Sequence, residues 1–248
     1  MVKSNIETTN KLTMIAQMTN DAKFQILEFE KLDGGINTAS LIKAQEINEK
    51  NIRLRQVRII LEDSIVAIEN NKISYFFGDI SVINKKAKPM TFSKKFFTGK
   101  LLEEDEDIIK PLYEGTGEIF LKPDFKNYAL IELEEEEIVV ASDNFVCSEG
   151  SIEIQESIEN SMKVYKLLGS GIVILELPVP EHEIFKCNLS NNTLKTDGSL
   201  VVLRNSSIEY STEISKNSLD EENPKMLNVF SGSGEIWVLP TKEVYKSI

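Results

Sequence analysis

A Gly-x-Gly triplet followed directly by an apolar run occurs three times in this chain. The copies are Gly115-Thr-Gly117-Glu-Ile-Phe-Leu, Gly169-Ser-Gly171-Ile-Val-Ile-Leu and Gly232-Ser-Gly234-Glu-Ile-Trp-Val. Self-similarity at a long spacing is the sequence signature of repeated supersecondary units. A unit of a few short strands does not bury its apolar face alone, whereas several packed units do. The chain is therefore predicted to be built from packed β-units.

The text around the triplets extends this similarity. A Ser-Ile-Glu run ends the first two copies, at Ser151 and Ser207, and a weaker early copy leads to Ser81. No long Gly/Ser/Pro-rich linker divides the chain. We therefore expect one compact β-rich domain over residues 1–248, with three pseudo-repeats at roughly 23–100, 101–166 and 167–248.

Strand-like text dominates between the triplets. Val, Ile, Thr, Tyr and Phe cluster in short runs that are separated by Gly, Asn, Asp and Pro, which is typical of β-strands. The predicted strands include Phe24–Phe29, Val57–Leu61, Ser64–Ile68, Lys72–Phe77, Ile138–Cys147, Gly171–Leu177 and Ser199–Leu203.

Helical and turn signals are few. Thr38–Asn51 is predicted to be a helix with Ile42 on its apolar face and Thr38 or Ser40 as N-cap, and Asn10–Asp21 is predicted to be a short helix.

Two turns are also predicted. Asp197-Gly198 is a hairpin signal, and Glu134–Glu137 is expected at or near another hairpin, facing water. Ser215–Pro224 is expected to be an exposed loop.

The triplets differ from nucleotide-binding glycine motifs. Those motifs have a longer glycine spacing and precede a helix, whereas each triplet here precedes a strand. Glycine suits a sharp turn or a close approach of two backbones. A structural role in the repeats is therefore predicted for Gly115, Gly117, Gly169, Gly171, Gly232 and Gly234.

Composition restricts the location of the protein. Lys and Arg number 28 and Asp and Glu number 40, which gives a net charge of −12. No apolar run exceeds four residues and residues 1–20 are polar, so neither a transmembrane helix nor a signal peptide is predicted. The two cysteines, Cys147 and Cys187, offer no disulfide framework. A cytoplasmic protein is expected.

The charge is unevenly distributed. Residues 1–100 carry a net charge of +5 and residues 101–248 carry −17. One basic segment interleaved with phenylalanines is a candidate patch for an anionic membrane or single-stranded nucleic acid. A solvated loop with buried phenylalanine anchors is the favoured interpretation, because the acidic remainder repels phosphate groups. The segment contains Lys85, Lys86, Lys88, Phe92, Lys94, Lys95, Phe96, Phe97 and Lys100.

Residue types that carry catalysis are scarce. His182 is the only histidine, and its odd spacing from Cys187 places two strand side chains on opposite faces. A zinc site normally needs three or four Cys or His ligands. We therefore expect no enzyme, no cofactor and no histidine-based metal site. A Ca²⁺ or Mg²⁺ site made of carboxylates is left open, although solvated loops are favoured for the acidic runs Glu103–Asp107 and Glu134–Glu137.

Taken in order, these motifs resemble the altered-inheritance-of-mitochondria protein twenty-four family, a bacterial and mitochondrial family long described as a domain of unknown function. The similarity is carried by the three Gly-x-Gly strands, by Glu136–Glu153 and by Leu194–Glu209, and it extends over about residues 57–241.

The resemblance implies a mainly β fold with few short helices. Three fused copies of the small unit of the tryptophan RNA-binding attenuation protein, a short double-stranded β-helix or sandwich, are implied. The eukaryotic branch of the family is linked to mitochondrial organisation, and no catalytic residues are implied. RNA binding is not transferred, because a shared fold does not imply a shared function.

Our first functional hypothesis is a non-catalytic β-scaffold or interaction protein that forms a homo-oligomer through its sheet edges, with an unknown protein partner as a further option. One alternative is a module that binds a small molecule or lipid in an apolar pocket. The other is a membrane or nucleic-acid binder that uses the Lys85–Lys100 segment, which the overall acidity disfavours.

Overall fold

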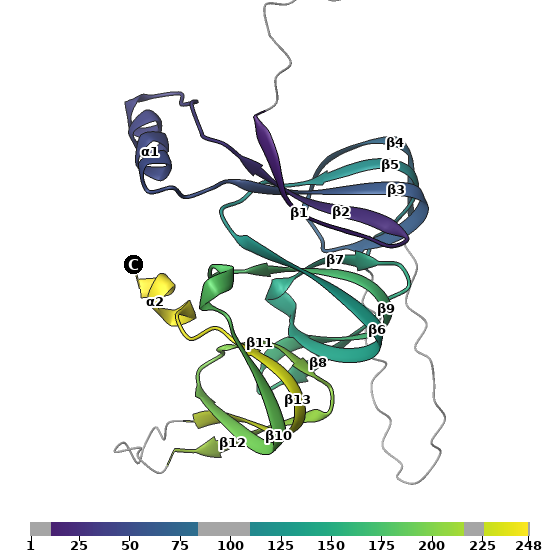
Figure 1. Ribbon diagram of the computed structural model, residues 1–248, viewed down its shortest axis with the longest axis vertical. Helices are drawn as coiled ribbons and strands as arrows, with labels where there is room; N and C mark the ends of the chain where they lie inside the picture. Colours follow the sequence, from purple (N-terminus) through teal and green to yellow (C-terminus); the bar gives the residue numbers. More distant parts are fainter. Residues whose placement is uncertain (1–10, 84–109, 216–225, 248) are drawn as a thin grey trace, which may run out of the picture.

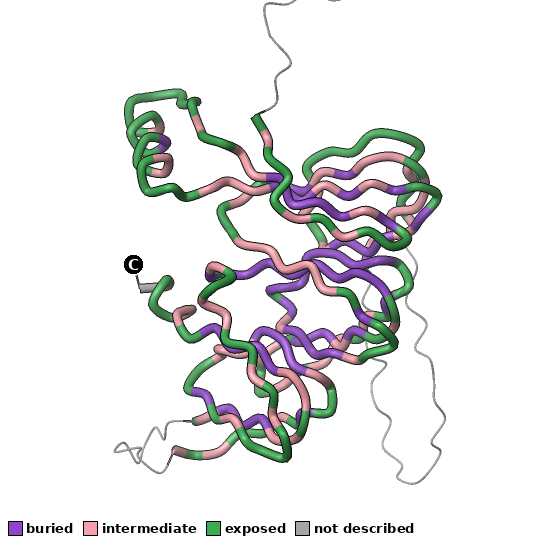
Figure 2. Tube along the Cα trace, viewed as in Figure 1, coloured by how far each residue is buried: buried purple, intermediate pink, exposed green. Residues whose placement is uncertain are grey.

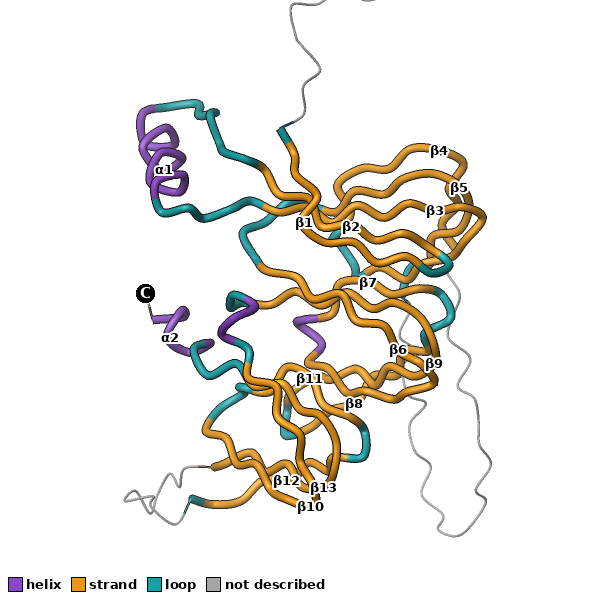
Figure 3. The backbone as a smooth tube through the Cα atoms, viewed as in Figure 1, coloured by secondary structure: helices purple, strands orange, loops and turns teal. Residues whose placement is uncertain are grey.

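The computed structural model describes residues 11–83, 110–215 and 226–247, and strands dominate these residues (Figure 3). The mainly β class predicted from the sequence is therefore confirmed. The strands are β1 (Leu12–Thr19), β2 (Ala22–Phe29), β3 (Arg55–Ile68), β4 (Ile73–Ile83), β5 (Leu112–Leu121), β6 (Asn127–Ala141), β7 (Phe145–Glu149), β8 (Glu153–Glu159), β9 (Met162–Leu177), β10 (Phe185–Asp197), β11 (Val201–Asn205), β12 (Ile208–Ile214) and β13 (Met226–Val238). The helices are α1 (Thr38–Glu49), α2 (Lys242–Ser247) and the 3-10 turns η1 (Ser142–Asn144) and η2 (Glu181–Glu183).

The strands form three tiers along the long axis of the molecule (Figure 1). β1 to β5 make the first tier, β6 to β9 the second and β10 to β13 the third. All pairings are antiparallel, and the main path runs β1-β2-β3-β7-β9-β6-β11-β13-β10. The tiers are joined where β7 pairs with β3 and where β11 pairs with β6.

The apolar core lies mainly between tiers. One cluster joins β2, β3 and β5 to Cys147 and Ile174 of the second tier, and a second joins β6 and β9 to Leu203 and Trp237 of the third. The third tier has its own small cluster, with Ile208, Phe230 and Ile236 as buried members. Figure 2 shows the buried stretches concentrated in the middle of the stack. Burial in shared clusters fits units that do not bury their apolar faces alone.

The predicted helix at residues 38–51 is present as α1, but its cap and its face differ from expectation. Asn37 is the N-cap, and its side chain accepts a hydrogen bond from the N–H of Ser40 in a capping box. Ile42 is exposed, and Ala44 is the one buried residue of the helix. The helix lies beside the first tier and is largely solvated (Figure 2).

The short helix predicted for Asn10–Asp21 is wrong. Leu12–Thr19 is strand β1, which pairs with β2 along its whole length through one bulge between Met14 and Ala16. The apolar residues of this segment suit a helical spacing in isolation. A neighbouring strand with unpaired backbone groups decides in favour of the sheet.

The predicted strand Ile138–Cys147 is divided in two. β6 ends at Ala141, η1 turns the chain through Ser142–Asn144, and β7 begins at Phe145. Both strands then pair with β9. The polar residues Ser142–Asn144 thus form a corner between two apolar segments, and the residues 138–140 and 145–147 on its two sides are buried.

The two turn predictions were wrong in detail. Asp197-Gly198 connects β10 to β11, but these two strands do not form a hairpin. Each of them pairs with β13 instead. Glu134–Glu137 lies inside β6 rather than at a hairpin, although Glu134 to Glu136 are exposed as predicted.

Some predictions concern parts of the chain that the structure does not describe. Lys85, Lys86, Lys88, Phe92, Lys94, Lys95, Phe96, Phe97 and Lys100 lie outside the described residues, as do Glu103–Asp107 and most of Ser215–Pro224. The pseudo-repeat boundaries and the single-domain organisation stay predictions.

Candidate interaction surface

Each Gly-x-Gly triplet lies in a long strand opposite a β-bulge. The triplets are in β5, β9 and β13, and the bulges interrupt β3, β6 and β10. The extra residue of each bulge adopts a left-handed backbone, with φ of 56° at Asp63, 57° at Glu135 and 50° at Asn191. A bulge of this kind bends its strand and increases the local twist.

The middle residue of each triplet has a hydroxyl group, which accepts a hydrogen bond from the backbone N–H of the residue at the bulge. The N–H of Asp63 donates to Oγ1 of Thr116 at 3.1 Å, and the N–H of Glu135 donates to Oγ of Ser170 at 2.9 Å. The third bond, from Asn191 to Oγ of Ser233, is also 2.9 Å. The sequence shows Thr or Ser at this place in all three triplets, but the bond itself depends on the register of strands that are far apart in sequence.

Four of the six triplet glycines lie where a neighbouring backbone carbonyl leaves no room for a side chain, and Gly171 and Gly234 lie against side chains instead. A Cβ on Gly115 would lie 2.0 Å from the carbonyl oxygen of Asp79, and one on Gly117 would lie 2.3 Å from that of Phe77. Gly169 and Gly232 approach the carbonyls of Ser151 and Ser207 in a similar way, at 2.9 and 2.6 Å. All six triplet glycines have a positive φ between 127° and 158°. The triplet glycines therefore allow neighbouring segments to approach the strand more closely than a side chain would permit.

Glu149 is a fully buried carboxylate at the junction of the first two tiers. It accepts hydrogen bonds from the N–H of Ala22 at 2.9 Å, the N–H of Ile172 at 3.0 Å and Nδ2 of Asn20 at 2.9 Å. Asn205 holds the corresponding place in the third tier, where its Oδ1 accepts from the N–H of Glu235. The carboxylate oxygens of Glu149 accept hydrogen bonds from backbone and amide donors of distant segments, so this side chain connects neighbouring strands.

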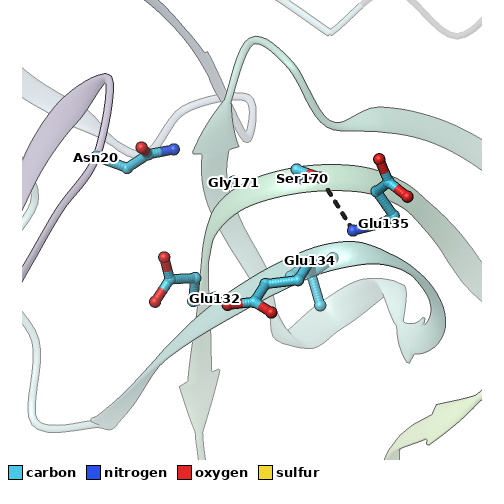
Figure 4. A pocket seen from close by; sticks show the side chains of 7 residues that line it. Asn20, Glu132, Glu134, Glu135, Ser170 and Gly171 are labelled. Atoms are coloured by element: carbon cyan, nitrogen blue, oxygen red, sulfur yellow. Dashed lines mark hydrogen bonds between the residues drawn. The ribbon is translucent and has the colours of Figure 1, made fainter.

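Lys110 occupies a second buried polar cluster. Its Nζ pairs with Glu69, donates to the Tyr165 hydroxyl at 2.9 Å and lies 5.5 Å from the centre of the Phe145 ring. Desolvation lowers the pKa of Lys110 and raises the pKa of Tyr165 to about 12. The cluster packs against the core and does not line the pocket of Figure 4.

The candidate nucleophiles are poorly placed for catalysis. Burial raises the pKa of the Cys147 thiol, which is fully enclosed in the core. Cys187 is half-buried, and burial raises its pKa as well. The His182 side chain is exposed on η2. Within the described residues, no group of three or more His, Cys, Asp or Glu side chains is arranged to hold a metal ion.

The pocket in Figure 4 is polar and open. It has a volume of about 470 Å³ and lies between the turn that joins β1 to β2 and the bulge of β6. Three carboxylates on its wall repel phosphate and anionic lipid headgroups. Its lining residues are Asn20, Glu132, Leu133, Glu134, Glu135, Ser170 and Gly171.

Strand β4 carries a run of exposed aromatic side chains. Tyr75, Phe76 and Phe77 are 51%, 43% and 54% exposed, although they stand in consecutive positions of one strand. Tyr75 and Phe77 flank Phe120 of β5, with ring centres at 4.7 and 6.2 Å. Among the described strands, β4 pairs with β5 alone, so its other edge presents unpaired backbone groups. The sequence signal for this exposure was the run of three adjacent aromatic residues. Successive side chains of a strand point to opposite faces, so such a run places aromatic rings on both faces.

The family model described as Mitochondrial biogenesis AIM24 matches residues 46–241. The crystal structure of protein SPYM3_0169 from Streptococcus pyogenes has a TM-score of 0.55 at 18% sequence identity, covering 79% of this chain and 92% of that chain. At this identity the likeness shows the fold alone. No curated protein matches the chain, and within the described residues no helix is long and apolar enough to cross a membrane.

Proposed function

This chain belongs to the Mitochondrial biogenesis AIM24 family, and we propose that it is a non-catalytic β-scaffold that associates with copies of itself. The proposal depends on one observation above all. Within the described residues β4 is an edge strand, and it exposes three consecutive aromatic side chains beside backbone groups that no described strand pairs. Exposed apolar edge strands associate with other strands unless they are blunted by charge, proline or a cover.

The burial of the thiol and carboxylate groups discussed above supports a non-catalytic role. The enclosed Cys147 thiol and the half-buried Cys187 thiol both have a raised pKa, which disfavours the nucleophilic thiolate. The buried carboxylate of Glu149 is saturated by N–H donors. A general acid or base needs access to a substrate at hydrogen-bond distance, and Glu149 has no exposed surface.

The pocket of Figure 4 gives little support to the lipid-binding alternative. Small-molecule sites are usually concave and mostly apolar, whereas this pocket is open and carries Glu132, Glu134 and Glu135. The proposal therefore places function on the outer strands rather than in a cavity.

Two measurements on gently purified full-length protein test the proposal. Light scattering at micromolar concentrations is expected to give a mass that is a multiple of 28.0 kDa. Native mass spectrometry is expected to give subunits of bare polypeptide mass. A monomer throughout the concentration range contradicts self-association, and a retained mass on every subunit indicates a binding module instead. Cell fractionation tests the cytoplasmic location that belongs to this proposal.

A further inference from the structure

The second tier is attached to the first by the outer edge of β7. Ser148 of β7 lies opposite Ala67 of β3 in antiparallel pairing. Beyond the end of β7, the N–H of Gly150 donates to the carbonyl of Ile65 at 2.8 Å. The C-terminal half of β3 therefore pairs with β7. We call β7 the linking strand of the second tier and β3 the receiving strand of the first.

The third tier is attached to the second in the same way. Arg204 of β11 lies opposite Val139 of β6, again antiparallel, and the N–H of Ser206 donates to the carbonyl of Glu137 at 3.0 Å. The two junctions thus use the same backbone pattern, although the sequences that meet in them are different.

Strand β4 has the linking position in the first tier. In each junction, the middle residue of the linking strand also pairs with the strand that carries a triplet. Ser148 pairs with Val173 and Arg204 pairs with Ile236, and each partner lies two positions after the second glycine of its triplet. By the same count Phe76 of β4 pairs with Ile119, two positions after Gly117. Tyr75, Phe76 and Phe77 are therefore the linking strand of the first tier, and no described tier lies beyond them.

Strand β10 has the receiving position in the third tier. The receiving residue Ala67 lies three positions after Ser64, which pairs with Gly115. Val139 likewise lies three positions after Glu136, which pairs with Gly169. Lys195 holds this place in β10, three residues after Asn192, which pairs with Gly232. Among the described strands β10 pairs only with β13, so the edge at Lys195 receives no linking strand.

Burial differs sharply between the occupied and the unoccupied positions. Ser148 and Arg204 are buried in the junctions, whereas Phe76 is 43% exposed. On the receiving side, Ala67 and Val139 are buried and Lys195 is exposed. The ends of the stack thus expose the positions that the internal junctions cover.

We propose that a second copy of this chain continues the stack head to tail, with Tyr75–Phe77 of one copy pairing antiparallel with Leu194–Thr196 of the next. Phe76 then lies opposite Lys195, as Ser148 lies opposite Ala67 within the chain. The inference rests on the proposed self-association and specifies the surfaces that perform it. Two different surfaces meet, so the contact generates a ring or a filament rather than a two-fold dimer.

Disulfide trapping tests the pairing in full-length protein carrying Cys187→Ser. Directly opposed residues of antiparallel strands have Cα atoms about 4.5 to 5.5 Å apart, which a disulfide spans. We expect Phe76→Cys mixed with Lys195→Cys to give covalent dimers under mild oxidation, whereas each variant alone gives none. The matched control is Phe185→Cys, at an exposed residue near the other end of β10, which is expected not to link to Phe76→Cys.

A second measurement avoids engineered thiols. Phe76→Lys places a charge opposite Lys195 and is expected to raise the dissociation constant of the oligomer at least tenfold, whereas Phe185→Lys leaves it within twofold. Self-linking of Phe76→Cys, or an oligomer that neither forms the 76–195 link nor responds to Phe76→Lys, overturns the inference while leaving self-association intact. A wild-type protein that is monomeric by light scattering overturns both.

Discussion

The backbone N–H of Glu135 donates a 2.9 Å hydrogen bond to the Oγ of Ser170, across the bulge between β6 and β9 (Figure 4). Glu135 has a left-handed backbone, with φ of 57°, and this conformation turns its N–H out of the strand ladder. A hydroxyl between two glycines provides the missing acceptor. The bond gives the middle residue of each triplet a structural role, because its hydroxyl accepts the N–H that the bulge removes from the strand ladder.

Removal of this hydroxyl is expected to weaken the fold modestly. Ser170→Ala leaves the N–H of Glu135 to water, and the net contribution of such a bond is about 0.5 to 1.5 kcal/mol. Ser211→Ala, at an exposed serine of β12, is the matched control. Urea unfolding of both variants measures the difference, and equal free energies of unfolding would show that the bulge does not depend on the bond.

A side chain at the first triplet is expected to be far more damaging. Gly115→Ala places a Cβ 2.0 Å from the carbonyl oxygen of Asp79, at a φ of 136° that side chains rarely adopt. Overpacking and a positive φ together are expected to cost about 3 kcal/mol or more. Gly34→Ala, which meets nothing within 4 Å, is expected to change stability by less than about 0.5 kcal/mol. Thermal denaturation of the pair decides, and similar melting temperatures would contradict the close approach.

Glu149→Gln tests the buried carboxylate at the junction of the first two tiers. The carboxylate accepts three N–H bonds, whereas an amide retains one acceptor oxygen and turns an NH₂ toward the remaining donors. The expected loss is about 3 kcal/mol, because bonds to a buried charged acceptor are strong and their donors are left unpaired. Glu153→Gln on the exposed side of β8 is the control. A free energy of unfolding that matches this control would refute the assigned role.

Stability is expected to fall in alkaline solution, in part through Tyr165. Burial raises the pKa of Tyr165 from 10.0 to about 12. Between these values the unfolded chain releases a proton that the folded chain retains, so the free energy of unfolding decreases as pH rises. The contribution of one such tyrosine between pH 10 and 11 is about 1 kcal/mol.

Tyr165→Phe separates this effect from other titrations. It loses the 2.9 Å bond from Lys110, which is expected to cost about 1 kcal/mol at pH 8. Its stability should nevertheless decline less steeply than that of the wild type above pH 10, whereas Tyr75→Phe, at an exposed residue, should follow the wild-type slope. Urea titrations at pH 8, 10 and 11 measure the slopes, and a wild-type slope in Tyr165→Phe would be the contrary result.

Local patterns were sufficient for most of the strands and for one helix. Alternation and β-branched residues placed the strands near Phe24, Val57 and Ile172, and a polar start with helix-forming residues placed α1. The errors occurred where a local pattern had two solutions. Leu12–Thr19 suits a helix by spacing, but the edge of β2 makes it a strand.

The candidate surface was harder to predict than the fold. Residues Lys72 to Phe77 were recognisable as a strand, yet their exposure depends on β4 having only one described neighbour. The burial of Glu149 was also hidden, because its donors at Asn20 and Ile172 come from distant parts of the chain.

The sequence alone determined the β class, the family and the recurrence of Gly-x-Gly strands, because these depend on residue type and short spacing. Tertiary structure decided the register of the bulges, the pairing of β7 with β3 and of β11 with β6, and the edges at Phe76 and Lys195 that no described strand pairs. The physical reason is that antiparallel partners are selected by burial and backbone hydrogen bonding over the whole fold. A strand's own residues specify its two faces, but its neighbours determine which edge stays open.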